Sequence, residues 1–541
     1  MEKLKGVGVS KGIAIGEVFL YLPEEIKVDI NERDNIPVSD KKKKLEITKD
    51  KSRKELQSIY EKMKSGKTEK EAGIFEAQAL FVDDPTLDER ITELIEQGFT
   101  LIAAVKKVFG EAAEEMEQME NEYFKQRAKD IRDVSSRLIH HILGKPLPDL
   151  SYLSKSSIIV ARDLTPSDTA SLDRKNVFGF ATDMGGATSH TAIIAETLGI
   201  PAIVGLKNVT EKVKHGDPII INGETGEVFI YPNDDTEKLF IEKISLIEKE
   251  KSKLEKVKFL QAITKSGIKI EVSANIGSPN DADVAIKQGA DGVGLFRTEF
   301  LFLDRNTPPT EEEQLKAYKA VLEKFNGKHV IIRTLDIGGD KQIPYLNLQK
   351  ELNPFLGVRA IRLCFEKVVL FKIQLRAILR ASVYGKALIM YPMIAVKEEV
   401  LKANEILNAV KEELTKEGIP FDKDIQVGIM VEIPSAALNA EELSDYVDFF
   451  SIGTNDLTQY TFAADRTNEA LSYLYQPLNS ALLKLVKMTI DASHKKGKWT
   501  GMCGELAGDP EAIPILVELG IDELSMAPSK IPFAKKIIKE L

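Results

Sequence analysis

A histidine at position 190 follows a pair of glycines and two hydroxyl residues. The segment 185–192 reads Gly-Gly-Ala-Thr-Ser-His-Thr-Ala, and Thr188 or Ser189 is placed to cap an apolar helix over 193–198. A helix N-terminus presents unpaired N–H groups, and glycines let the backbone come close to a ligand. An imidazole in this place can take up a dianion beside the positive end of the helix, so His190 is the candidate nucleophile.

The alternative interpretation of His190 is a histidine at a helix start that does no chemistry. The glycines and hydroxyls favour the nucleophile but do not by themselves name a phosphate, since neither a P-loop lysine nor a G-x-G-x-x-G pattern is present. The other histidines lack this setting, and we expect them to be structural or surface residues: His140, His141, His215, His329 and His494.

A second group of reactive residues lies at or just after the ends of predicted strands in the C-terminal half. It contains Arg297, Arg333, Arg359, Arg466, Glu432, Asn455, Asp456 and Cys503. Arginine forks bind phosphate and carboxylate groups in a bidentate way. Two carboxylates, Glu432 and Asp456, can hold Mg²⁺, which would stabilise an enolate while the arginines hold a phosphoryl group.

Cys503 stands among glycines in the segment 501–505, Gly-Met-Cys-Gly-Glu. We interpret it as a general acid beside the predicted cation. The alternative is a small buried hydrophobic residue, which is a common role for cysteine.

Regular alternation of strands and helices beyond residue 265 would bring these residues to one face. The predicted strands are 268–274, 292–297, 329–335, 387–393, 426–432, 448–453, 498–503 and 523–526. Helical stretches separate them, for example 310–325, 398–416 and 480–496, and a helix over 530–540 follows. Eight such units predict a (β/α)8 TIM-type barrel, whose reactive residues lie at the C-terminal ends of its strands. A doubly wound sheet is the alternative.

The N-terminal part predicts an α/β multidomain organisation. Strands are expected within 5–20 and again at 157–161, 177–182, 202–204, 218–222 and 227–231. The segment between them is rich in Lys, Glu, Leu and Ala at helical spacing, so a helical bundle over 25–145 is inserted into one domain made of 1–24 and 146–232. A charged helical linker over 233–264 would join this domain to the barrel at 265–541.

Composition narrows the function classes. The chain has 541 residues, with 84 acidic against 74 basic residues and a net charge of −10, which argues against nucleic acid as a partner. Two cysteines cannot form a disulfide framework, so a reducing, cytoplasmic compartment is expected. The sequence contains no run of about eighteen apolar residues, so we do not expect membrane insertion.

Several longer motifs resemble those of the Enzyme I family, the phosphoenolpyruvate–protein phosphotransferases of the bacterial sugar phosphotransferase system. They are Asp-Leu-Thr-Pro-Ser-Asp at 163–168, Gly-Gly-Ala-Thr-Ser-His-Thr-Ala-Ile-Ile-Ala from 185, Gly-Val-Gly-Leu-Phe-Arg-Thr-Glu at 292–299, Arg-Thr-Leu-Asp-Ile-Gly-Gly-Asp-Lys at 333–341, Asn-Pro-Phe-Leu-Gly-Val-Arg at 353–359, Glu-Ile-Pro at 432–434 and Phe-Ser-Ile-Gly-Thr-Asn-Asp-Leu at 450–457. The resemblance covers essentially the whole chain.

The resemblance implies a swivelling phosphohistidine domain, in which His190 takes the phosphoryl group of phosphoenolpyruvate and passes it to a histidine of the carrier protein HPr. It implies that the four arginines, Asn455 and Asp456 bind the substrate, that Glu432 and Asp456 hold Mg²⁺ (or Mn²⁺), and that Cys503 protonates the enolate to give pyruvate. It also implies that the helical insertion binds HPr and that the barrel forms a homodimer.

Three alternatives stay beside this interpretation. A dikinase or synthase of the same superfamily would need an ATP-grasp domain, whereas the residues before the His190 domain are helical and lack a glycine-rich nucleotide loop. A nitrogen-type paralogue would carry a sensory domain ahead of the Gly-Val-Gly-Val motif at residues 6–9. A non-catalytic HPr-docking protein would have no reason to keep the arginine, acid and histidine set.

Overall fold

The computed structural model describes most of the chain. It leaves out residues 24–25, 65–68, 120–121, 146–149, 151–156, 166–167, 169–175, 187–190, 193–194, 197–198, 304, 339–342, 347, 349–350 and 467, and the side chains of 62–64, 69–72, 122–126, 344 and 469. The chain forms two compact units, Met1–Ile247 and Glu248–Leu541. No helix in the described ranges is long and apolar enough to cross a bilayer.

The first unit contains an eight-stranded mixed sheet in the order β1-β8-β7-β3-β4-β5-β6-β2. Its strands are β1 (Glu2–Lys5), β2 (Val7–Ser10), β3 (Ile13–Tyr21), β4 (Ser157–Ala161), β5 (Val177–Thr182), β6 (Ala202–Val204), β7 (Pro218–Asn222) and β8 (Glu227–Ile230), with a short helix α8 (Val209–Lys212) before β7. β4 is buried at every position, as expected for an apolar run in the middle of a sheet. The predicted strands are confirmed.

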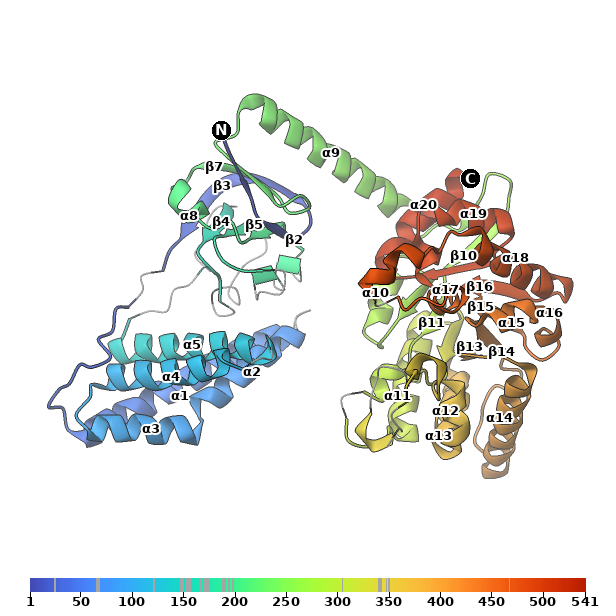
Figure 1. Cartoon of the computed structure of the whole chain (residues 1–541), viewed down its shortest axis with the longest axis horizontal. Coiled ribbons are helices and arrows are strands. Elements are labelled where there is room, and N and C mark those ends of the chain that lie inside the picture. Colours follow the sequence, from blue (N-terminus) through green and yellow to red (C-terminus); the bar gives the residue numbers. More distant parts are fainter. Residues whose placement is uncertain are drawn as a thin grey trace. The chain divides into compact units, whose positions relative to one another are not determined.

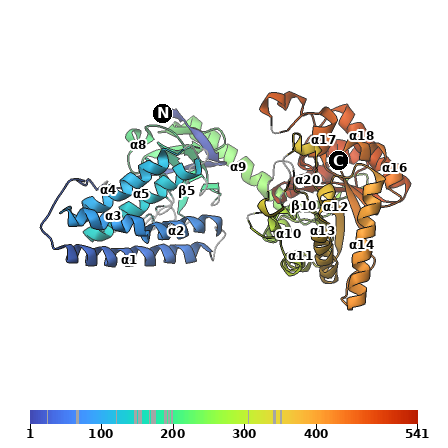
Figure 2. The same cartoon turned by 60° about the horizontal axis from the view of Figure 1, so that its bottom comes forward.

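A helical bundle separates two strands that are neighbours in this sheet. β3 and β4 pair in parallel, with Glu17 opposite Ser157. In the sequence, 135 residues separate the last residue of β3, Tyr21, from the first residue of β4, Ser157. The bundle comprises α1 (Val38–Lys64), α2 (Glu69–Val82), α3 (Pro85–Glu96), α4 (Leu101–Glu117) and α5 (Glu122–Leu143). In both views α4 runs along α5, and α1 along α2 (Figures 1 and 2).

The break at Asp84-Pro85 has a clear local cause. Asp84 is the N-cap of α3 and accepts hydrogen bonds from the N–H groups of Thr86 and Leu87, while Pro85 is the first helical residue. A capping aspartate followed by proline favours a new helix start at this point.

Helix α9 (Asp234–Val257) contains the boundary between the two units (Figure 1). Within the predicted linker over 233–264, α9 supplies the helical part, which ends at Val257. Beyond Val257 the chain forms a short strand β9 (Ala262–Ile263) that pairs antiparallel with the start of the barrel. Gly267 has φ +88°, so it closes a tight turn that brings the two strands together.

The second unit is a closed barrel, which confirms the predicted (β/α)8 fold. Its parallel strands are β10 (Lys269–Ile276), β11 (Val293–Phe296), β12 (Val330–Arg333), β13 (Ala387–Tyr391), β14 (Val427–Val431), β15 (Phe449–Ile452), β16 (Trp499–Met502) and β17 (Glu523–Met526). Closure comes from β10, which pairs with both β17 and β11.

Helices surround the barrel between successive strands (Figure 1). They are α10 (Asp281–Lys287), α11 (Glu311–Phe325), α12 (Ile361–Glu366), α13 (Val368–Ala381), α14 (Lys397–Glu417), α15 (Pro434–Leu438), α16 (Ala440–Leu443), α17 (Thr454–Phe462), α18 (Ser480–Lys495), α19 (Ala512–Leu519) and α20 (Ile531–Glu540). Short 3₁₀ turns lie at Glu299–Leu301, Pro344–Leu346, Pro354–Leu356, Ser382–Tyr384, Glu469–Leu474, Glu505–Gly508 and Pro528–Lys530.

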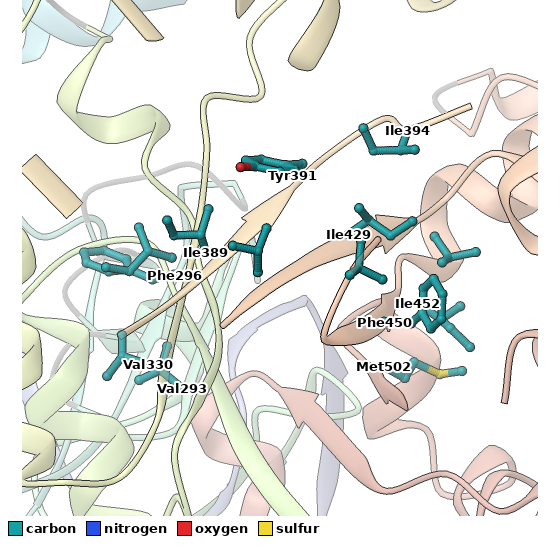
Figure 3. Packing of buried hydrophobic residues seen from close by; sticks show 14 of the residues in the cluster. Val293, Phe296, Val330, Ile389, Tyr391, Ile394, Ile429, Phe450, Ile452 and Met502 are labelled. Atoms are coloured by element: carbon teal, nitrogen blue, oxygen red, sulfur yellow. The ribbon is translucent and has the colours of Figure 1, made fainter. Parts of the chain in front are cut away.

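Alternate strand positions supply two separate cores. Figure 3 shows Ile389 and Tyr391 of β13 and Ile429 of β14 within the large cluster, which the barrel strands share with the surrounding helices. The intervening positions form a smaller cluster made of strand positions and one residue just beyond a strand: Leu295, Ile331, Leu388, Met390, Met430, Phe449 and Cys503. Because side chains alternate between the two faces of a strand, one face of each strand fills the barrel interior. Polar residues lie at the C-terminal ends of the strands.

Candidate functional site

A cavity of about 320 Å³ opens at the C-terminal ends of the barrel strands. Every residue of the second predicted group lines it: Arg297, Arg333, Arg359, Arg466, Glu432, Asn455, Asp456 and Cys503. Each lies at the end of a strand or in a segment that follows one, which is the place where a barrel exposes backbone and side chains to a ligand.

Arg333, the last residue of β12, is buried between two carboxylates. Its Nη2 donates to Glu299 Oε1 at 2.8 Å, and its Nη1 lies 2.8 Å from Asp336 Oδ2. Burial opposes the charge of Arg333, but these carboxylates outweigh it and raise the pKa of the guanidinium. Its Nε has no hydrogen-bond partner among the described residues, so one buried donor is left for a ligand.

Arg359 continues the same network. Its Nη2 donates to Asp336 Oδ1 at 3.0 Å, and its Nη1 lies 3.5 Å from Asp456 Oδ1 and 3.3 Å from the hydroxyl of Tyr460. Arg466 approaches the other oxygen of Asp456 at 3.9 Å and is partly exposed. Two aspartates therefore hold three arginines in place.

Arg297 differs from the other arginines. Its side chain is exposed at the mouth of the cavity, and within the described residues no carboxylate forms an ion pair with it. Because its charge is not neutralised locally, Arg297 is the cation most available to an incoming anion.

Glu432 is almost completely buried, and its Oε1 accepts a hydrogen bond from the backbone N–H of Met393 at 2.7 Å. Burial raises the pKa of this carboxyl, and the carboxylates of Asp456 and Asp336 raise it further. Asp456 Oδ1 is buried without a hydrogen bond from the described part of the chain. Crowded, under-coordinated carboxylates of this kind are stabilised by a cation.

The carboxylates of Glu432 and Asp456 suit a hard cation because their ligand atoms are oxygens. Glu432 and Asp456 line the cavity together, and Mg²⁺ is commonly held by one or two carboxylates plus substrate oxygens and water. In the ranges described, no three His, Cys, Asp or Glu residues converge as a complete metal cage. Glu432 and Asp456 could therefore supply two oxygen ligands to such an ion.

Cys503 follows β16 and is buried beside the cavity, with Sγ 3.9 Å from the carbonyl of Ile452. Burial raises the pKa of this thiol to about 11, so it carries its proton at neutral pH. The proton is thus available for donation.

Asn455 is held by a reciprocal pair of hydrogen bonds with Glu505. Asn455 Nδ2 donates to Glu505 Oε1 at 3.2 Å, and Asn455 Oδ1 accepts from the backbone N–H of Glu505 at 2.9 Å. The Asn455 side chain links the first turn of α17 to the segment after Cys503.

Two residues with strained backbone conformations adjoin residues of the cavity. Ala360, which follows Arg359, has φ +52°, and Met393, which donates to Glu432, has φ +58°. Such conformations cost side-chain-bearing residues energy and persist where the surroundings fix them, often at functional sites. Gly338 has φ +123°, and a Cβ there would lie 2.5 Å from Arg359 Cβ, so only glycine lets this loop pass the arginine.

The predicted nucleophile His190 and the residues 187–189 lie outside the described residues, as does most of the predicted helix over 193–198. The chain that leads to them is firmly anchored. Met184 donates its N–H to the carbonyl of Arg162, Gly185 has φ +104°, and Thr191 Oγ1 donates to the carbonyl of Leu164. Of the two predicted glycines, Gly185 is required by its backbone conformation.

A buried carboxyl lies in the same domain as His190. Asp168 accepts from the hydroxyl of Tyr21 at 2.5 Å and from the N–H and hydroxyl of Thr165 at 2.8 and 2.9 Å. Burial raises the pKa of Asp168, although these hydrogen bonds act against the shift. Tyr21, Thr165 and Asp168 therefore form a local network of hydrogen bonds.

The remaining histidines have structural partners, as predicted. His140 Nδ1 contacts the carbonyl of Ser136, His141 lies 3.0 Å from Glu55 Oε2, and His494 lies 2.8 Å from Asp522 Oδ2. His215 contacts the ring of Phe19 edge-on, and His329 is buried between Glu523 and Glu271.

Sequence reasoning did not single out Asp336, Glu299 or Glu505. Asp336 lies three residues after Arg333 in the motif at 333–341, and this spacing could have indicated the ion pair between them. Glu299 also stood in a motif, two residues after Arg297, but it contacts Arg333 instead. The contact of Glu299 with Arg333 therefore follows from barrel closure and not from local spacing.

Comparison with known proteins extends over the whole chain. The family described as PEP-utilising enzyme matches in three parts: the PEP-binding domain at residues 251–541, the N-terminal domain at 5–127 and the mobile domain at 153–226. The chain is 47% identical over 553 residues to the phosphoenolpyruvate-protein phosphotransferase of Staphylococcus carnosus (strain TM300), covering 100% of this chain and 94% of that protein. It is 48% identical over 548 residues to the protein of the same name from Listeria innocua serovar 6a, with coverage of 100% and 94%. A solution structure of an Enzyme I protein is 41% identical and covers 45% of this chain and 99% of its own, with a TM-score of 0.39.

Proposed function

The chain belongs to the phosphoenolpyruvate–protein phosphotransferase family of PEP-utilising enzymes, and from this membership we propose its reaction. The phosphoryl group of phosphoenolpyruvate passes to His190 and then to a histidine of the carrier protein HPr, and pyruvate is released. This is the first step of sugar uptake by the phosphotransferase system. The observation that carries the proposal is the cavity lined by four arginines, five carboxylates (Glu432 and Asp456 among them) and the thiol of Cys503.

The arginines would hold the substrate. Arg297 is exposed and without a carboxylate partner in the described residues, so it can bind the phosphoryl group and move with it. Arg333 and Arg359 are buried and fixed by Asp336, which suits recognition of a carboxylate or phosphate at a constant position. Arg466 and Asn455 complete the rim.

The first transfer breaks the P–O bond to the enol oxygen and forms a P–N bond to a ring nitrogen of His190. The remaining enolate takes a proton at C3 from the thiol of Cys503, which gives pyruvate and leaves a thiolate that water reprotonates. Mg²⁺ (or Mn²⁺), held by Glu432 and Asp456, would supply electrostatic stabilisation of the enolate and phosphoryl oxygens. The buried, protonated state of Cys503 supports its role as the acid.

The organisation of the chain suits a carrier between two partners. We assign 1–24 and 146–232 to the swivelling phosphohistidine domain, 25–145 to the HPr-binding insertion, 233–264 to the linker and 265–541 to the substrate barrel. We assign homodimerisation to the barrel, as the family resemblance implies. We place the enzyme in the cytoplasm, without nucleic acid or membrane partners.

The proposal is tested by incubating the protein with ³²P-labelled phosphoenolpyruvate and Mg²⁺ and mapping an acid-labile, base-stable phosphate by peptide mass analysis. We expect one label, on His190, that HPr removes. His190→Ala abolishes the label, whereas His215→Ala, in the same unit, keeps it. A label on another residue, or none on the wild-type protein, would favour the non-catalytic docking protein.

A further inference from the structure

The carbonyl of Cys503 receives a hydrogen bond from a strand two places along the barrel. Asn275 at the end of β10 donates through Nδ2 to Cys503 O at 2.9 Å, although the two residues are 228 positions apart. In the strand order β16, β17, β10, the Asn275 side chain reaches across β17 to the end of β16. Cys503 itself lies one residue beyond β16.

A second hydrogen bond fixes the orientation of the Asn275 amide. Ser525 Oγ on β17 donates to Asn275 Oδ1 at 2.7 Å. Ser525 is fully buried, so its hydroxyl has little competition from water. With Oδ1 occupied by a donor, the amide NH₂ must face the Cys503 carbonyl.

The backbone around this relay is adapted to it. The pairing of β10 with β11 shifts register between Ala274 and Asn275, and an irregularity of this kind re-aims a side chain at the rim of a barrel. Position 294 on β11 is a glycine, and a Cβ there would lie 2.5 Å from Ser525 Oγ. Glycine at this position therefore leaves room for the serine hydroxyl.

The peptide of Cys503 is consequently held at both ends. Its N–H donates to the carbonyl of Ile452 at 3.0 Å, as in the regular barrel ladder, and its carbonyl accepts from Asn275. Without Asn275 this carbonyl would lose the side-chain hydrogen bond that holds it, and the N–H would remain as the backbone anchor of Cys503. A shift of the Cys503 backbone at Cα would move Sγ with it.

We propose that Asn275 and Ser525 are positioning residues, which fix the Cys503 peptide so that the thiol is aimed at C3 of the enolate. This inference rests on the proposed function, because it assigns the proton donor of that reaction. The S–H bond of Cys503 breaks as the C–H bond of pyruvate forms, and neither Asn275 nor Ser525 exchanges a proton with the substrate. Their effect is on the geometry of the donor, where a displacement of 1 Å can slow a reaction about 100-fold.

The test compares three single variants of the full-length protein. Asn275→Asp keeps the shape and the acceptor for Ser525 but replaces the NH₂ donor by an oxygen that repels the Cys503 carbonyl. Ser525→Ala removes only the hydrogen bond that orients Asn275. Ser273→Ala is the matched control, because Ser273 is equally buried on β10 and its hydroxyl has no hydrogen-bond partner among the described residues.

Steady-state turnover of phosphoenolpyruvate is measured with HPr in H₂O and D₂O. We expect kcat to fall about 100-fold in Asn275→Asp and about 3- to 10-fold in Ser525→Ala, with KM for phosphoenolpyruvate unchanged within about 2-fold. The solvent isotope effect on kcat rises in both variants, because protonation becomes the slow step, and Ser273→Ala resembles the wild type. A merely structural role would lower the melting temperature without changing the isotope effect.

The outcomes separate this inference from the proposed function. If the wild-type protein is not phosphorylated on His190, the proposed function fails. If the wild type is active but both variants keep its kcat and isotope effect, only the positioning role is wrong. A loss in Ser273→Ala equal to that in Ser525→Ala, or a rise in KM without a fall in kcat, would also overturn it. Should Asn275→Asp fail to fold, the milder Ser525→Ala variant decides.

Discussion

Arg359 Nη2 donates a hydrogen bond of 3.0 Å to Asp336 Oδ1 in the wall of the barrel-top cavity. The other oxygen of this aspartate lies 2.8 Å from Arg333 Nη1. One carboxylate therefore spaces two buried guanidinium groups that would otherwise repel each other. The distance between the two guanidinium groups therefore depends on Asp336 as well as on the arginines.

Replacing Asp336 by Asn should weaken substrate binding and the barrel together. The amide cannot neutralise two guanidinium groups, and loss of one member of a buried ion-pair network typically costs about 3–5 kcal/mol. We expect KM for phosphoenolpyruvate to rise at least about 10-fold and the barrel to melt at a lower temperature. Steady-state kinetics and calorimetry measure the two effects.

The control is Asp283→Asn, which removes an exposed carboxylate 2.9 Å from Lys324. Exposed pairs of this kind contribute about 0–1 kcal/mol, so both measurements should stay close to the wild type. An Asp336→Asn protein with an unchanged KM would show that the arginines keep their places without the aspartate.

Replacing Cys503 by Ala should slow turnover far more than it weakens binding. Loss of a positioned general acid typically costs about 10²- to 10⁴-fold in rate, whereas the thiol makes no charged contact with the substrate. Stopped-flow formation of pyruvate gives the rate, and calorimetric titration of the His190→Ala background with phosphoenolpyruvate gives the affinity.

The second cysteine provides the comparison. Cys364 on α12 is also buried but does not line the cavity, so Cys364→Ala should leave turnover within about 2-fold. Equal losses in the two variants would point to a packing effect, and the acid would have to be sought elsewhere.

The barrel and the bundle could be predicted because their signals are local. Each of the eight strands is a short apolar run. The C-terminal end of each observed strand lies within about two residues of the predicted end, and the strand at 523–526 matches its prediction at both ends. Asp84-Pro85 marked a helix start through cap chemistry that needs only neighbouring residues. Family membership was likewise carried by contiguous motifs, and the comparisons confirm it.

The contacts inside the site could not be predicted, because they join residues that only barrel closure brings together. The hydrogen bond between Asn275 and Cys503 joins two strands that have a third strand between them, and the sequence around either residue does not indicate the other. Glu299 pairs with Arg333 although it is closer in sequence to Arg297. The positive φ of Met393, which aims its N–H at Glu432, also depends on the surrounding barrel.

Mg²⁺ should bind through Glu432 and Asp456 whether or not turnover occurs. Binding to the folded state stabilises it by about 2.7 kcal/mol at a concentration 100 times the dissociation constant. We expect Mg²⁺ with phosphoenolpyruvate to raise the melting temperature of the His190→Ala barrel, and chelation by EDTA to reverse the shift. Differential scanning calorimetry measures this directly.

Glu432→Gln and Asp456→Asn should each lose most of the Mg²⁺-dependent shift, because a neutral amide binds the cation more weakly. Glu441→Gln, an exposed acid paired with Lys495, serves as the control and should keep the full shift. If both cavity variants responded to Mg²⁺ as the wild type does, the ion would have to bind at another site.

His329 should make barrel stability depend on pH in the alkaline range. Burial opposes its protonation, but Glu523 Oε1 at 2.7 Å and Glu271 Oε1 at 3.3 Å outweigh burial and raise its pKa to about 10. Because the folded pKa lies above the unfolded value, near 6.5, the stabilisation is complete below about pH 6.5. It declines by about 1.4 kcal/mol per pH unit up to pH 10, from a total on the order of 5 kcal/mol.

The measurement is the unfolding free energy of the barrel transition in wild-type and His329→Gln proteins between pH 6 and 10.5. We expect the difference between them to be largest at pH 6 and to shrink steadily towards pH 10, since the glutamine does not titrate. His494→Gln removes an exposed histidine paired with Asp522 and should show a small difference at every pH. A His329→Gln difference that stayed constant across the range would mean that His329 stabilises the barrel by packing against Trp499 and not by its charge.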